Sequence, residues 1–85
     1  MKEFTYTVTD PLGIHARPAG QLVKEAGKFT SLCTVTKGSK TEKLTRLIGI
    51  MMLAVKQGDV VTVRAEGEDE DRAIRNLRMF FQENL

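Results

Sequence analysis

The segment Gly13-Ile14-His15-Ala16-Arg17-Pro18-Ala19 places the only histidine of the chain immediately before an amphipathic helical pattern. Pro18 suits a first helical turn, where its missing N–H would have had no intrahelical partner. Gly27 marks the expected end of the helix. Between these two residues the apolar side chains recur at helical spacing, at Ala19, Leu22, Val23 and Ala26. The sequence therefore predicts a helix that begins beside His15.

The start of this helix is a suitable place for an anion. Helix N-termini present unpaired backbone N–H groups and a partial positive charge. We expect the helix start at Ala16 and Arg17 to bind phosphate, with the Arg17 guanidinium contacting its oxygens. A lone histidine is more often an ordinary surface or core residue, but a neutral imidazole nitrogen is also a nucleophile. In this setting we predict that His15 is transiently phosphorylated and that His15 and Arg17 are the catalytic residues.

Length and composition restrict the class of protein. We expect 85 residues to form one domain, spanning 1–85. Hydrophobic residues at 41% and charged residues at 28% are usual for a globular chain and argue against disorder. The single Cys33 has no partner for a disulfide or a metal site, so we expect neither a metal nor a cofactor. Without a long apolar run or a signal peptide, we expect a cytoplasmic protein that does not insert into membranes.

Charge is balanced overall but unevenly placed. Lys and Arg number 13 against 11 Asp and Glu, a net charge of +2 that is too small to indicate bulk nucleic-acid binding. The second half of the chain holds an acidic run, Glu66, Glu68, Asp69, Glu70 and Asp71. The first half is basic, with Arg17, Lys24, Lys28, Lys37, Lys40, Lys43 and Arg46. This asymmetry predicts a basic face around the His15 helix that attracts acidic partners.

Strand patterns flank the helix. Residues 3–9 alternate apolar and polar until Asp10-Pro11 breaks the pattern, and we take Phe4 and Tyr6 as core rather than as a platform for RNA bases. Residues 30–36 and 41–44 predict a hairpin with a turn at 37–40, in which Cys33 is buried.

A fourth strand and a last helix are predicted in the final third of the chain. Residues 61–66 alternate in the manner of a strand, after a turn at 57–59. Asp69 is the expected N-cap of the last helix, and the acidic run around it suits the positive helix end. The helix would turn Ile74, Leu77 and Phe81 inward.

Residues 47–55 carry no polar side chain and predict a short helix with a connection. A segment that is apolar all round cannot be wholly covered in so small a domain, so some of Leu47, Ile48, Met51 and Met52 should be exposed as a patch. We place Ile50 and Leu53 in the core. The predicted partner-binding surface consists of Leu47, Ile48, Met51, Gly20 and Lys24.

The predicted element order is β-α-β-β-α-β-α, which favours an α+β fold with an antiparallel sheet. The segment from Gly13 to Ala19 resembles the active-site signature of HPr, the histidine-containing phosphocarrier of the phosphoenolpyruvate-dependent sugar phosphotransferase system. The resemblance implies an open-faced β-sandwich, with a four-stranded antiparallel sheet and three helices on one face. It also implies that phosphorylated enzyme I is the donor, that enzyme IIA proteins or domains are the acceptors, and that the Leu47 segment docks on both.

No loop of the chain resembles a nucleoside-triphosphate site, which favours a carrier over a stand-alone catalyst. We also expect the protein to be a monomer. Two alternatives are an HPr-like regulatory module that only binds proteins and a small nucleic-acid-binding domain. One position departs from the family. Many Gram-positive members carry a regulatory phosphoserine just before the Leu47 segment, where this chain has Thr45 and Arg46. We expect that regulation to be absent, or moved to Thr45.

Overall fold

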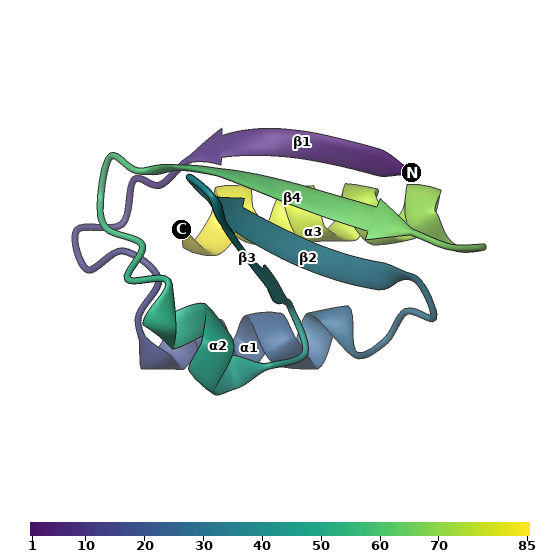
Figure 1. Ribbon diagram of the computed structural model, residues 1–85, viewed down its shortest axis with the longest axis horizontal. Coiled ribbons are helices and arrows are strands. Elements are labelled where there is room, and N and C mark those ends of the chain that lie inside the picture. The colour runs from purple at the N-terminus through teal and green to yellow at the C-terminus, as the bar shows by residue number, and fades with distance from the viewer.

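The computed structural model describes residues 1–85 and contains four strands and three helices in the predicted order (Figure 1). No helix has both the length and the hydrophobicity that crossing a membrane requires. The elements are β1 (Lys2–Thr7), α1 (Ala16–Ala26), β2 (Leu32–Lys37), β3 (Lys40–Lys43), α2 (Leu47–Met52), β4 (Val60–Glu66) and α3 (Glu70–Asn84).

The strands form one antiparallel sheet in the order β1-β4-β2-β3, and the helices lie on one side of it (Figure 1). Val63 of β4 is paired with Phe4 on one side and Val35 on the other, and all three side chains are buried. The other face of the sheet is polar, and Glu3 and Arg64 form an ion pair of 2.8 Å across neighbouring strands. The predicted α+β open-faced sandwich is confirmed.

One cluster of 20 buried apolar residues fills the space between the sheet and the helices. Phe81 of α3 is fully buried, and its ring lies 5.8 Å from that of Phe4 and 5.5 Å from that of Tyr6, measured between centroids. The assignment of Phe4 and Tyr6 to the core is therefore confirmed, although Tyr6 is only partly buried. Cys33 is buried and free, as predicted.

Asp69 has a different role from the predicted one. It occupies the N-cap position of α3, but its side chain makes no capping hydrogen bond. The carboxylate instead accepts hydrogen bonds from the N–H groups of Thr30 and Ser31, both at 2.9 Å, and from the Ser31 hydroxyl. These donors, the Ser31 hydroxyl first, lower the pKa of Asp69 to about 2. Asp69 thus joins the start of α3 to the turn before β2, and Thr30 and Ser31 are not part of the strand predicted there.

The other predicted boundaries are off by one or two residues. β1 ends at Thr7, because the next amide, that of Val8, bonds to the carbonyl of Asp59, outside the strand ladder. The predicted stop of α1 at Gly27 is confirmed, but its φ of −66° is helical, so the helix ends there without a left-handed glycine.

Candidate functional site

His15 is the N-cap residue of α1, with φ −98° and ψ 179°. Its ring makes no capping hydrogen bond, and about a third of the side chain, 34%, is exposed. The first helical hydrogen bond runs from the Ala19 amide to the His15 carbonyl at 3.0 Å. Since Pro18 has no N–H, the amides of Ala16 and Arg17 are the free donors at this helix end. The predicted phosphate-binding backbone is therefore open directly next to the His15 ring.

Asp10 is a neighbour of His15 that was not predicted from the sequence. One carboxylate oxygen accepts a hydrogen bond from the Leu12 amide at 2.8 Å, and the other lies 3.6 Å from Nε2 of His15. The carbonyl of Asp10 also accepts the Gly13 amide at 2.9 Å. An aspartate followed by Pro-x-Gly is a turn signal, but only the folded turn brings its carboxylate to the ring.

The loop before His15 rests on the segment after α2. Gly13 has a positive φ of +66°, and a Cβ at this position would lie 2.1 Å from the Val55 carbonyl oxygen and 2.8 Å from the Lys56 Cα. The next amide, that of Ile14, donates to the same Val55 carbonyl at 3.1 Å. A residue without a side chain is therefore required for this close approach. The residues around Val55 fix where α1 begins and hence where His15 stands.

A polar surface hollow surrounds the ring. His15 and Arg17, the two predicted catalytic residues, both line it, and the Arg17 side chain has no carboxylate partner. No group of three His, Cys, Asp or Glu side chains is placed to hold a metal ion. Asp10, Gln21 and Asn84 were not predicted to belong to the site. The complete lining is Asp10, His15, Arg17, Pro18, Gln21 and Asn84.

Helix α2 carries the predicted apolar patch. Ile48 and Met52 are 73% and 74% exposed, and Leu47 and Met51 are 39% and 37% exposed. Ile50 and Leu53 are buried, as predicted. A groove runs along this helix beside β3, lined by Glu42, Arg46, Leu47, Ile48, Gly49 and Met52.

The remaining two residues of the predicted partner surface lie on α1, which packs against α2. Gly20 faces open space, since a Cβ at this position would have no atom within 4 Å, and Lys24 is exposed. Partner binding at these positions stays a prediction.

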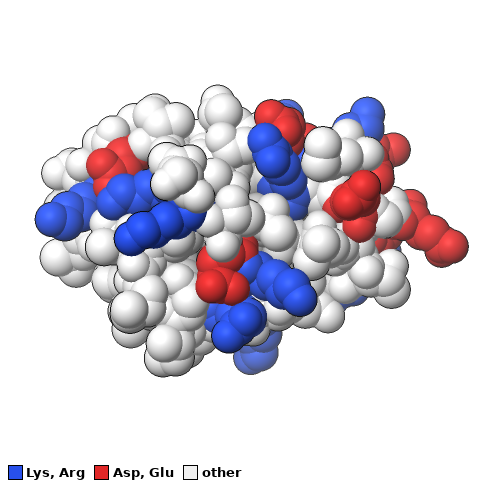
Figure 2. Space-filling model, viewed as in Figure 1, with Lys and Arg blue, Asp and Glu red and all other residues white.

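The predicted basic face is partly neutralised by neighbouring carboxylates. Lys28 pairs with Glu25 at 3.1 Å, and Arg46 lies 3.7 Å from Glu42. Arg17 and Lys24 on α1 have no such partner. On the face that Figure 2 shows, one end and the lower part of the molecule carry mainly basic side chains with acidic neighbours, and the opposite end carries mainly acidic side chains with basic ones among them. On this face the charge asymmetry is a difference between two ends, and it is reduced at the acidic end, where Asp69, Glu70 and Asp71 lie within 4 Å of the cationic groups of Arg72, the N-terminus and Lys2.

The fold and the site together define the class of protein: a small α+β domain whose only histidine lies at the N-terminus of a helix with two free backbone amides. The family model described as "PTS HPr component phosphorylation site" matches residues 2–83. The phosphocarrier protein HPr of Lysinibacillus sphaericus is 48% identical over 83 residues, which cover 98% of this chain and 94% of that protein. The chain therefore belongs to the HPr family of phosphocarrier proteins of the phosphotransferase system.

Solved structures agree with this assignment. The histidine-containing phosphocarrier protein of a Mycoplasma superposes with a TM-score of 0.94 at 36% identity, covering 96% of this chain and 93% of that one. The catabolite repression protein Crh of Bacillus subtilis superposes with a TM-score of 0.79 at 40% identity, covering 88% of this chain and 86% of that one. The Crh structure is a dimer with a swapped domain.

Proposed function

We propose that His15 accepts a phosphoryl group from phosphorylated enzyme I and passes it to enzyme IIA proteins or domains. The observation that carries this proposal is the exposed His15 ring at the N-terminus of α1, next to the two free amides of Ala16 and Arg17. Family membership supports the phosphocarrier role, and the site geometry supports His15 as the residue that performs it. Family membership also supports a cytoplasmic location.

The position of Asp10 favours Nδ1 as the nitrogen that is phosphorylated. A phosphoryl group on Nε2 would stand next to the Asp10 carboxylate, 3.6 Å from that nitrogen, and two anions repel each other. The lone pair of Nδ1 attacks the phosphorus, a nitrogen–phosphorus bond forms, and the bond between phosphorus and the donor breaks with its electron pair leaving on the donor. The free amides and the Arg17 guanidinium then stabilise the oxygens of the bound group. The reverse sequence delivers it to the acceptor.

The test is incubation of the protein with enzyme I and radiolabelled phosphoenolpyruvate, followed by acid treatment. We expect an acid-labile label in the wild-type chain and none in His15→Ala, because His15 is the only histidine. An acid-stable label, or a label on the His15→Ala protein, would contradict the proposal. The circular dichroism spectrum of the variant shows whether it is folded.

Arg17 is tested with a matched arginine elsewhere. Arg17→Ala should slow transfer about 10- to 1,000-fold, because a charge that stabilises the transferring phosphoryl group is lost. Arg75 of α3 is also exposed and has no ion-pair partner, so Arg75→Ala should transfer at the wild-type rate. Equal rates for the two variants would remove Arg17 from the mechanism.

The apolar patch on α2 is proposed as the docking surface for these partners. Ile48→Glu places a charge on a side chain that is 73% exposed and should therefore weaken partner binding without unfolding the protein. The measurement is the KM of enzyme I for this protein. An unchanged KM would move the docking surface elsewhere.

The similarity to Crh supports a second candidate, a regulatory module that binds other proteins without carrying phosphate. The same labelling experiment distinguishes the two, since a module of this kind would bind enzyme I or other proteins but leave His15 unlabelled.

A further inference from the structure

Asp10 is the one carboxylate beside the His15 ring, and three hydrogen bonds fix its place in the loop. Its Oδ1 accepts the Leu12 amide at 2.8 Å. Its carbonyl accepts the Gly13 amide, and its own amide donates to the Leu85 carbonyl, both at 2.9 Å. The second carboxylate oxygen, Oδ2, lies 3.6 Å from Nε2 of His15. The hydrogen bond to Oδ1 therefore holds Oδ2 toward the ring.

This arrangement determines which nitrogen of the neutral ring carries the proton. A neutral imidazole has an N–H on one nitrogen and a lone pair on the other, and a carboxylate is only a hydrogen-bond acceptor. Neither ring nitrogen of His15 makes a hydrogen bond with the protein, so Oδ2 of Asp10 is the group that distinguishes them. The tautomer with the proton on Nε2 is favoured, because that nitrogen faces Oδ2. The lone pair is then on Nδ1, which is free to attack phosphorus.

We propose that Asp10 is a positioning residue that keeps a proton on Nε2 of His15 in both directions of phosphoryl transfer. This inference rests on the proposed function and adds a residue and a proton to it. When the Nδ1 lone pair forms the nitrogen–phosphorus bond, the ring becomes positively charged, because the proton stays on Nε2. The carboxylate of Asp10 stabilises that charge across the 3.6 Å between Oδ2 and Nε2.

The same proton matters when the phosphoryl group leaves. The nitrogen–phosphorus bond breaks, and its electron pair returns to Nδ1. With the proton on Nε2 the ring departs as neutral imidazole. Without that proton it would have to depart as an imidazolate anion, which is a much poorer leaving group. Asp10 thus supports acceptance of the phosphoryl group and its delivery.

The substitution Asp10→Asn separates this role from a purely structural one. The amide oxygen of the new side chain still accepts the Leu12 amide, so the turn is kept. Its NH2 group then takes the place of Oδ2 and points a donor at Nε2 of His15. A donor at this place favours the lone pair on Nε2 and therefore the proton on Nδ1, the nitrogen that has to attack. Asp10→Asn keeps the loop but reverses the tautomer.

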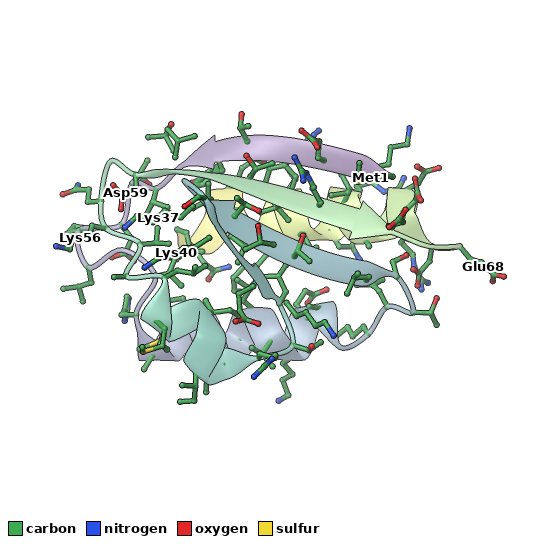
Figure 3. The ribbon with its side chains drawn as sticks, viewed as in Figure 1. Met1, Lys37, Lys40, Lys56, Asp59 and Glu68 are labelled. Carbon is green, nitrogen blue, oxygen red and sulfur yellow. The ribbon has the colours of Figure 1, made fainter.

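The test measures kcat and KM for transfer from phosphorylated enzyme I to Asp10→Asn, Asp10→Ala and the control Glu68→Gln. Glu68 is exposed and has no ion-pair partner. Figure 3 shows it at the opposite end of the molecule from Lys56, on whose backbone the His15 loop packs at Gly13. We expect Asp10→Asn to lower kcat about 10- to 100-fold with KM unchanged, since the docking surface is intact. Glu68→Gln, which loses the same charge, should match the wild type.

The alanine variant gives the order of effects that distinguishes the two roles. Asp10→Ala loses the acceptor for Leu12 but points no donor at the ring, so its kcat should fall less than that of Asp10→Asn. A purely structural role predicts the opposite order, because only the alanine variant breaks the turn. A lower kcat in Asp10→Ala than in Asp10→Asn would therefore overturn the proposal.

The tautomer itself is measured by 15N NMR of the His15 ring, at a pH at which the ring is neutral. We expect the proton mainly on Nε2 in the wild type and mainly on Nδ1 in Asp10→Asn. The same tautomer in both proteins would also overturn the proposal. If every variant is labelled on His15 at the wild-type rate, the proposed function stands and Asp10 has no part in it. If the wild type takes up no label, the proposed function fails, and this inference fails with it.

Discussion

Replacing Gly13 with alanine tests whether the segment after α2 sets the position of His15. The new Cβ would lie 2.1 Å from the Val55 carbonyl oxygen, and the backbone already has a φ of +66°. A left-handed conformation costs a residue other than glycine about 1–2 kcal/mol, and overpacking against backbone costs about 1–3 kcal/mol more. We therefore expect Gly13→Ala to lower the free energy of unfolding by about 2–5 kcal/mol. With a urea m-value of about 1 kcal/mol per M, the midpoint should fall by about 2 M or more.

Alanine variants of two other glycines separate the backbone strain from the overpacking, the two contributions to the expected decrease in the free energy of unfolding. Gly38 has a similar φ of +61° but nothing within 4 Å of its Cβ position, so Gly38→Ala should cost only the backbone strain of about 1–2 kcal/mol. Gly20 lies inside α1 with open space around it, so Gly20→Ala should raise the stability by about 0.5–1 kcal/mol.

Transfer to His15 gives a second measurement of the same effect. In Gly13→Ala it should slow more than the loss of folded protein explains, because the loop has to move away from Val55 and carry the ring with it. The reasoning is refuted if Gly13→Ala is no less stable than Gly38→Ala, or if its folded fraction transfers at the wild-type rate.

Three further predictions concern pH, backbone strain and regulation. The pKa of Asp69 is about 2 in the folded protein, below its ordinary value of 3.8, so its contribution to stability is complete above about pH 4 and is lost as the pH falls toward 2. The free energy of unfolding, measured with urea, should fall less between about pH 5 and about pH 2.5 in Asp69→Asn than in the wild type. Equal decreases in the two proteins would contradict the role of the Ser31 contacts. Ala54 has a φ of +53°, so Ala54→Gly should raise the free energy of unfolding by up to about 1 kcal/mol and Ala54→Val should lower it; a destabilised glycine variant in thermal unfolding would argue against strain there. Incubation with a serine-directed HPr kinase and ATP should leave the wild type unlabelled, whereas Arg46→Ser should gain acid-stable phosphate, and site mapping of a label on Thr45 in the wild type would show that the regulation has moved.

The sequence alone determined the type and order of all seven elements. The spacing of apolar residues within a segment indicates which face of that segment is buried, and this information is local. It was present as alternation in residues 3–9 and 61–66 and as helical spacing from Ala19 to Ala26. The start of α1 directly after His15 was also a local property, set by Pro18 and by the apolar spacing that follows. The exposed patch on α2 followed from composition, because a helix without a single polar side chain cannot turn every residue toward one core.

Only the tertiary structure decided which segments meet. The sheet order β1-β4-β2-β3 brings residues 2–7 beside residues 60–66, and periodicity says nothing about the partner of a strand. Asp69 stands at the sequence position of a helix N-cap, but in the folded chain its carboxylate accepts hydrogen bonds from the amides of Thr30 and Ser31 instead. Asp10 and Val55 joined the surroundings of His15 in the same way, through a folded turn and a close backbone approach. Local patterns fix what each residue is able to do, whereas contacts between distant segments form only when the whole core packs, and these contacts complete the site.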